Sequence, residues 1–157
     1  MFKKGLSLLL AIILILSLSG CSDIWGGAFF LFLIKAGDDH ESQDDIFKFV
    51  REEEKELLNA IETGDFSVFE NQGFIKHIDA YETVVDFYCG GYGMGPSTSY
   101  VGFYYTPNHD MSAMWCVPSS SPLIPSGNGF EWMEPNGDNR YYTEHICGNF
   151  YYYEASF

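Results

Sequence analysis

Apolar residues follow three different spacings along this 157-residue chain. They form nearly unbroken runs up to residue 34, recur at helical spacing between residues 46 and 61, and alternate with polar residues in short segments from residue 84 onward. Unbroken runs are typical of membrane-associated segments, a period of about 3.6 predicts an amphipathic helix, and a period of two predicts strands. The pattern therefore predicts an apolar N-terminus followed by an α+β domain.

The helical part of the domain has clear start and stop signals. Ser42 and Asp44 are good N-cap residues, and Gly64 is a residue type that commonly ends a helix. Asp65 is placed to cap a short second helix that runs through Glu70. The apolar face expected for the first helix contains Ile46, Val50, Leu57 and Ile61.

The rest of the chain reads mainly as strands and turns. Residues 74–81 are ambiguous between helix and strand, residues 90–99 and 119–128 are expected to be loops, and Gly148-Asn149 is a two-residue hairpin signal. Strands are expected at residues 84–89, 100–105, 112–117, 130–134, 141–147 and 150–156. The expected fold is α+β, with an N-terminal helix or helix pair followed by a mostly antiparallel sheet of five or six strands.

One short segment suggests an alternative fold. Residues 58–69, with Gly64 and Asp65 in their middle, are similar to the helical start of cystatin-like or NTF2-like exported α+β domains. This resemblance implies a cystatin-like or NTF2-like fold.

The first 21 residues have the layout of an export signal. Lys3 and Lys4 precede an apolar run at residues 6–18, which is too short to span a bilayer comfortably because a spanning helix needs about 20 apolar residues. The run closes with Leu18, Ser19, Gly20 and Cys21. This segment resembles the lipobox of bacterial lipoproteins. The resemblance implies that residues 1–20 are removed and that Cys21 carries diacylglycerol and palmitate.

A lipid on Cys21 implies an extracytoplasmic protein anchored to the bacterial cell membrane. An ordinary secretory signal and one uncleaved membrane helix over residues 6–34 remain alternatives. The lysines keep the N-terminal end in the cytoplasm in either case, so the domain is expected outside. The apolar residues 24–34 are expected to lie against the membrane or to form the first element of the fold. The expected organisation is a signal peptide at 1–20, a membrane-proximal segment and acidic linker at 21–45, and one exported domain at 46–157.

Charge narrows the choice of partners. All 22 acidic residues follow Cys21, but only six of the eight basic residues do, so the exported part has a formal charge of −16 from six positive and 22 negative groups. This charge opposes nucleic-acid binding and suits a solvated surface, a basic partner or divalent cations.

Cysteines offer a second kind of site. Three follow Cys21, and the exported location permits disulfides, so two of the three are expected to pair without the sequence choosing which. A zinc site is the weaker alternative because no Cys-x-x-Cys spacing is present, and no metal or other cofactor is expected. The residues considered for either site are Cys89, Cys116 and Cys147, with His109 and His145 added for zinc.

The C-terminal hairpin predicts a candidate site. Pairing across Gly148-Asn149 puts His145 opposite Tyr152 and diagonal to Glu154. His145 and Glu154 would then share a face and could act as an acid–base pair, although a solvent-exposed polar face is the favoured interpretation. With the glycine-rich loop included, the candidate binding surface contains Tyr92, His145, Tyr152 and Glu154.

Aromatic residues suggest a binding function. The chain has 14 Phe, 11 Tyr and 3 Trp, more than a small core needs, and exposed tyrosines suit glycan or protein recognition. We therefore expect a non-enzymatic binding or structural domain at the cell envelope, with an envelope protein, peptide or glycan as ligand. One alternative is a small envelope hydrolase that uses His145 and Glu154, or Cys147 as nucleophile. Another is an acidic protective protein that masks a basic partner. No catalytic residue is assigned.

Overall fold

The computed structural model describes residues 39–70, 72–94, 97–118 and 121–157. The expected signal peptide, Cys21 and the apolar residues 24–34 lie outside these ranges. Within the described ranges, no helix is both long enough and apolar enough to cross a membrane.

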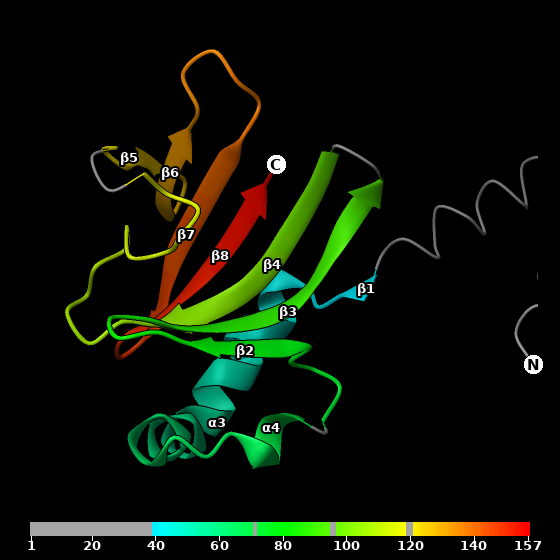
Figure 1. Ribbon diagram of the computed structural model, residues 1–157, viewed down its shortest axis with the longest axis vertical. Helices are drawn as coiled ribbons and strands as arrows, with labels where there is room; N and C mark the ends of the chain where they lie inside the picture. The colour runs from blue at the N-terminus through cyan, green and yellow to red at the C-terminus, as the bar shows by residue number, and fades with distance from the viewer. Residues whose placement is uncertain (1–38, 71, 95–96, 119–120) are drawn as a thin grey trace, which may run out of the picture. The chain divides into compact units, whose positions relative to one another are not determined.

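The described chain forms one antiparallel sheet with helices against one face (Figure 1). The elements are β1 (Asp39–His40), α3 (Gln43–Thr63), α4 (Ser67–Glu70), β2 (His77–Ala80), β3 (Val85–Met94), β4 (Ser97–Tyr105), β5 (Ile124–Ser126), β6 (Gly129–Met133), β7 (Arg140–Cys147) and β8 (Phe150–Ser156). The strands lie in the order β1-β3-β4-β8-β7-β6-β5, and β2 also pairs with β3.

The expected α+β class is confirmed, but the expected strand number is wrong. The described sheet has eight strands rather than five or six. β1 and β5 have two and three residues, too few to show an alternating pattern in the sequence. The ambiguous residues 74–81 contain β2.

The long helix α3 has the ends that the sequence predicts. The Ser42 side chain accepts a hydrogen bond from the backbone N–H of Asp45 at 3.2 Å, which satisfies one free donor of the first turn. Gly64 ends the helix in the left-handed conformation, with φ of 71°, and its N–H donates to the carbonyl of Ala60. One stripe of α3 is buried, which fixes how the helix lies on the sheet: Ile46, Val50, Leu57 and Ala60.

The face of the sheet toward α3 holds the larger hydrophobic core. The rings of Phe87 on β3 and Phe103 on β4 stack with centroids 4.6 Å apart, and both side chains are fully buried. Phe150 on β8 and Phe69 on α4 complete this packing. We call this side of the sheet the helix face.

The opposite side of the sheet is covered by the chain between β4 and β5, and we call it the loop face. Met114 and Val117 of that connection pack against Tyr104, Tyr141 and the strands beside them. Residues 112–117 were expected to form a strand, which is wrong. Asp110 accepts a hydrogen bond from the N–H of Ser112 at 2.9 Å, and such local bonds favour turns over strand pairing.

The glycine-rich residues 90–99 were expected to form a loop, but most of them belong to β3 and β4. β3 continues to Met94 and β4 begins at Ser97, so most of this segment is paired strand. The strand register shifts between Tyr88 and Gly90, and Gly90 has φ of 132°. Glycine tolerates this backbone conformation, so the bulge bends the strand without ending it.

A second bulge changes the predicted hairpin register. Cys147 pairs with Phe150 across the turn, as expected, but the register then shifts, and His145 pairs with Tyr151 instead of Tyr152. Tyr142 therefore pairs with Glu154. Because neighbouring residues of a strand point to opposite faces, His145 lies on the loop face and Glu154 on the helix face. The expected diagonal contact of His145 with Glu154 is wrong, so the acid–base pair that the hydrolase alternative requires does not form.

Candidate functional site

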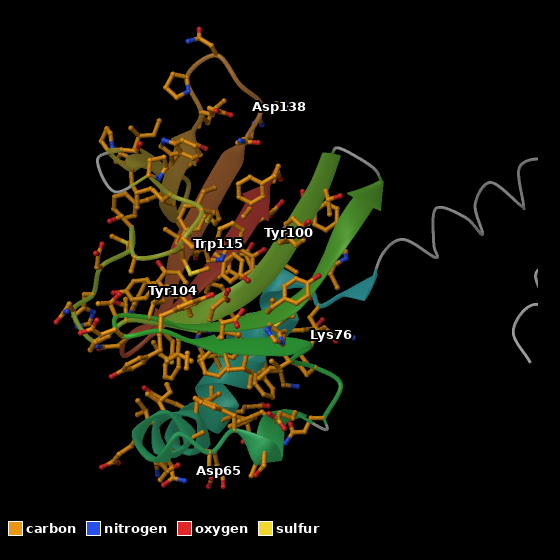
Figure 2. All side chains as sticks on the ribbon, in the orientation of Figure 1. Asp65, Lys76, Tyr100, Tyr104, Trp115 and Asp138 are labelled. Carbon is orange, nitrogen blue, oxygen red and sulfur yellow. The ribbon has the colours of Figure 1, made fainter. Side chains whose placement is uncertain are left out.

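An open cavity of about 410 Å³ lies on the loop face, between the sheet and the β4–β5 connection. Its walls are mainly aromatic, and we call it the aromatic pocket: Tyr81, Tyr88, Tyr100, Trp115 and Tyr153. Figure 2 labels Tyr100 and Trp115, which lie near each other over the sheet. A concave site of this volume and lining is typical of small-ligand binding.

The rim of the pocket consists of exposed aromatic side chains held by one another. Trp115 is 65% exposed, and its ring stacks on Phe157 with centroids 5.6 Å apart. Tyr100 lies 6.2 Å from Phe157 and 6.1 Å from Tyr88 between ring centroids. Large aromatic rings supply contact area at a low entropy cost, so this rim is suited to holding a ligand.

A buried carboxyl group lies in the pocket. Asp86 is only 6% exposed, and its Oδ1 atom has no hydrogen-bond partner among the described residues. The side chains of Tyr153 and Trp115 donate hydrogen bonds to this carboxyl group. Burial raises the pKa of Asp86 to about 6, because desolvation outweighs those hydrogen bonds. The group is therefore mostly ionised near neutral pH but poorly compensated.

A second carboxyl group lies directly beside the first. Asp79 on β2 is the cross-strand partner of Asp86 on β3 and also lines the pocket. The charge of Asp79 contributes to the raised pKa of Asp86. His77 Nε2 lies 3.2 Å from Asp79 Oδ1, so Asp79 has a local partner of its own. Like charges directly opposite in a sheet are destabilising, which makes this pair unusual for a purely structural role.

Two glycines let the tyrosines lie close to the sheet. A Cβ atom added to Gly102 would lie 2.4 Å from the carbonyl oxygen of Phe87 and 2.9 Å from the Tyr153 ring and hydroxyl. A Cβ atom on Gly91 would lie 3.1 Å from the hydroxyl of Tyr88. Glycine in a strand often marks such a close approach. These positions therefore help to shape the pocket.

The β4–β5 connection that carries Trp115 is fixed at several points. Asn149 donates from Nδ2 to the carbonyl oxygens of Thr106 and Pro107, at 3.1 and 3.0 Å. His109 Nδ1 and the hydroxyl of Tyr151 lie 2.8 Å apart, within hydrogen-bond distance. The hydroxyl of Tyr104 donates to the carbonyl of Met111 at 3.2 Å. The connection is thus held in place before any ligand binds.

The structure divides the binding surface expected from the sequence. Tyr92 donates a hydrogen bond to Glu154, and Tyr152 lies close to both, on the helix face. Tyr152 is only 3% exposed and belongs to the core, which leaves little of it for a ligand. His145 is exposed on the loop face, where its Nε2 atom lies 2.9 Å from the carbonyl oxygen of Gly148. The four residues do not form one surface.

The expected disulfide is not present, because Cys89, Cys116 and Cys147 are all free. Cys89 is buried in the helix-face core, Cys116 lines the pocket on the loop face, and Cys147 lies at the β7–β8 turn. The sheet separates Cys116 from Cys89, and β4 and β8 lie between the strands of Cys89 and Cys147. With two strands between them, Cys89 and Cys147 lie beyond the reach of a disulfide, whose Cα atoms lie within about 7 Å.

The same three thiols lack the environment of a nucleophile or a zinc site. Burial raises the pKa of Cys116 to about 12 and also raises the pKa of Cys147, where Glu54 adds to the effect. Burial likewise raises the pKa of Cys89. A reactive cysteine requires the opposite shift. In the described part of the chain, no three His, Cys, Asp or Glu side chains gather to hold a metal ion.

Sequence reasoning missed Asp86 and Trp115, the two residues most central to the pocket. A signal for Asp86 exists, because it is the one charged residue in the otherwise apolar run 84–89, where a strand was expected. Trp115 carries no comparable signal, since its position depends on how the connection folds over the sheet.

No protein-family model, no curated protein and no solved structure matches this chain.

Proposed function

We propose that this protein is a membrane-anchored cell-envelope lipoprotein whose exported domain binds a ligand without catalysing a reaction. The observation that carries the binding proposal is the aromatic pocket, with an exposed rim around the buried and incompletely paired Asp86. A buried carboxyl oxygen without a partner calls for an explanation, and carboxyl groups with strongly shifted pKa values gather at functional sites. The lipid anchor rests on the lipobox resemblance around Cys21.

The site supports binding better than hydrolysis. The raised pKa values of Cys116 and Cys147 do not favour a thiolate nucleophile, and the loop-face position of His145 separates it from Glu154.

A long helix on one face of an antiparallel sheet also supports a cystatin-like or NTF2-like fold as a proposal.

Replacing Cys21 tests the anchor. We expect the full chain, produced in bacteria fed labelled palmitate, to incorporate the label and to sediment with membranes. The Cys21→Ala chain should lose both properties, because alanine has no thiol to carry the lipid. Cys147→Ala is the matched control and should keep the label. Equal labelling of the wild type and Cys21→Ala would contradict the lipoprotein proposal.

Removing the rim aromatics tests the binding site. Amines, neutral sugars and short peptides are titrated into the full chain in detergent micelles, and the amide NMR shifts are recorded. We expect a ligand of this panel to shift the amide signals of residues in β3, β4 and β8 around the pocket. Trp115→Ala and Tyr100→Ala should weaken the response by roughly tenfold or more, since buried aromatic contacts dominate binding energy. His145→Ala, which removes an exposed side chain that does not line the pocket, should leave it unchanged. A panel in which no ligand shifts pocket residues would contradict the proposal.

Acidity favours one second candidate function. The chain has 22 acidic and eight basic residues, which supports a protective role against a basic partner. Such capture would weaken steeply with salt, because exposed charges are screened within about 10 Å at 0.1 M ionic strength. Capture of a cationic protein that persists in Trp115→Ala but disappears in salt would favour this role over the pocket.

A further inference from the structure

We propose that the aromatic pocket binds a protonated alkylammonium group, with the Asp86 carboxylate as its counter-ion. This inference rests on the proposed binding function and names the class of ligand. It follows from three features of the pocket: an oxygen that lacks a donor, a second carboxyl group beside it, and aromatic walls.

The first feature is the Oδ1 atom of Asp86, which is buried without a partner among the described residues. Leaving a buried charged oxygen unpaired is expensive, so a group that donates a hydrogen bond there is favoured. No described lysine, arginine or histidine lines the pocket to supply that donor. A ligand with an N–H bond and a positive charge satisfies the oxygen and its charge together.

The second feature is the neighbouring carboxyl group of Asp79. It lies opposite Asp86 in the β2–β3 ladder and lines the same pocket. His77 contacts Asp79 but does not line the pocket. Among the described residues that line the pocket, the carboxyl groups of Asp79 and Asp86 therefore face no lysine, arginine or histidine. This arrangement repels anions and attracts cations, and the acidic charge of the whole chain acts in the same direction.

The third feature decides between an organic cation and a metal ion. Tyr88, Tyr100 and Trp115 line the pocket with aromatic side chains, which stabilise an organic cation placed over a ring face. A hard metal ion instead needs about six or more oxygen ligands, and the described residues offer no cluster of three metal-binding side chains here. An alkylammonium with N–H bonds fits both the rings and the unpaired oxygen.

Protonation of Asp86 links this binding to pH. Burial raises the pKa of Asp86 to about 6, so the carboxyl group loses its charge as the pH falls through that value. Binding of a cation should weaken over the same range. The titratable or polar groups around Asp86 are Asp79 and His77 from β2, Tyr88 from β3, Tyr104 from β4, Tyr153 from β8, and Trp115 and Cys116 from the β4–β5 connection.

Calorimetric titration of the full chain in detergent micelles tests the inference. The probe is cadaverine, a flexible diamine, and the neutral probe of matched length is pentanediol. Tetramethylammonium tests the need for an N–H bond, calcium chloride tests a metal site, and N-acetylglucosamine tests a sugar site. Asp86→Asn removes the counter-ion, and Asp138→Asn, which changes an exposed residue of the β6–β7 loop labelled in Figure 2, is the matched control.

We expect cadaverine to bind the wild type and Asp138→Asn with equal affinity. Pentanediol should bind roughly tenfold more weakly, which corresponds to a loss of about 1.4 kcal/mol in binding free energy. Asp86→Asn should lower cadaverine affinity by roughly tenfold or more. Lowering the pH from about 7.5 to about 5 should weaken wild-type binding by roughly tenfold, because about one Asp86 in eleven stays ionised one unit below its pKa. This pH arm needs no variant, and near-ultraviolet circular dichroism shows whether Asp86→Asn is folded.

Other outcomes overturn the inference in distinguishable ways. If pentanediol or N-acetylglucosamine binds as tightly as cadaverine and Asp86→Asn changes nothing, the pocket takes a neutral ligand, and only the ligand class is wrong. Tetramethylammonium binding as tightly as cadaverine would refute the need for an N–H bond, and displacement of cadaverine by calcium would indicate a metal site. If no probe binds and the wider panel also leaves the pocket unperturbed, the proposed binding function fails as well.

Discussion

At the scale of single residues, Asp86 shows how function and stability conflict. The group is 6% exposed, faces the carboxyl group of Asp79 across the ladder and leaves one oxygen unpaired among the described residues. Burial, and to a smaller extent the charge of Asp79, disfavour the ionised form and raise the pKa of Asp86 to about 6. An apolar or amide side chain would suit the fold better, so the carboxyl group is best explained by what it binds.

Replacing Asp86 with asparagine should therefore stabilise the free protein near neutral pH. A carboxyl group whose pKa is raised in the folded state from 3.8 to about 6 contributes stability below pH 3.8, and that contribution is lost as the pH rises through about 6. Asparagine carries no charge at any pH and avoids this loss. We expect Asp86→Asn to raise the free energy of unfolding by about 1–3 kcal/mol near pH 7.5, with little gain near pH 4.

Urea denaturation of the ligand-free chain at several pH values measures this effect. Asp138→Asn, in an exposed loop, is the control and should follow the wild type at every pH. A variant that is less stable than the wild type near pH 7.5 would show that Asp86 supports the fold in its charged form.

Residue-level prediction succeeded where the signal was local and failed where it depended on register. Pairing of Cys147 with Phe150 follows from the turn residues between them. One bulge after that pair moved His145 to the other face, because a shift of one residue exchanges the faces of a strand. No feature of the sequence marks that bulge, so the predicted contact with Glu154 could not be corrected without the structure.

At the scale of elements, the strands of the loop face are shaped by close contacts at glycine. Gly102 on β4 allows the Tyr153 ring to lie against the strand, and the Tyr153 hydroxyl reaches Asp86. Adding a methyl group there brings it within 2.4 Å of the backbone oxygen of Phe87, which cannot move without disturbing β3. The pocket thus depends on the absence of a side chain at this position.

Gly102→Ala should lower both stability and binding. We expect a loss of about 1–3 kcal/mol in the free energy of unfolding, the usual range for overpacking, and weaker binding in the aromatic pocket because Tyr153 is displaced. Gly137→Ala is the matched control, since the three atoms nearest to its added methyl group belong to the flexible side chain of Glu134. Thermal denaturation and the amide NMR titration measure the two effects. A Gly102→Ala chain as stable as Gly137→Ala would show that the tight packing at β4 is not important.

Elements were predictable to the extent that their signals lie within a few residues. The N-cap at Ser42 and the terminating Gly64 defined α3 because capping is a local interaction. The connection at residues 112–117 was mistaken for a strand, since its apolar residues cover the loop face while its backbone forms turns. Apolar side chains alone do not distinguish these two ways of burying a segment.

At the scale of the whole molecule, the proposed lipid anchor and the proposed cation-binding pocket are consistent with each other. A lipid on Cys21 would hold the acidic domain near the membrane surface, where anionic headgroups also concentrate cations. The α+β class was predictable because helical and alternating patterns occupy separate parts of the chain. The pocket was not, because it joins Asp79 and Asp86 with Trp115 and Tyr153, which are distant in the sequence.

The most direct test of this account is a carbon NMR titration of the Asp86 carboxyl group in the full chain, with and without cadaverine. We predict an apparent pKa near 6 in the free protein, as burial requires, and a clear decrease with cadaverine, because a bound cation favours the ionised form. Asp86→Asn assigns the signal by its absence. An Asp86 pKa that cadaverine leaves unchanged would contradict the claim that this carboxylate receives a cationic ligand.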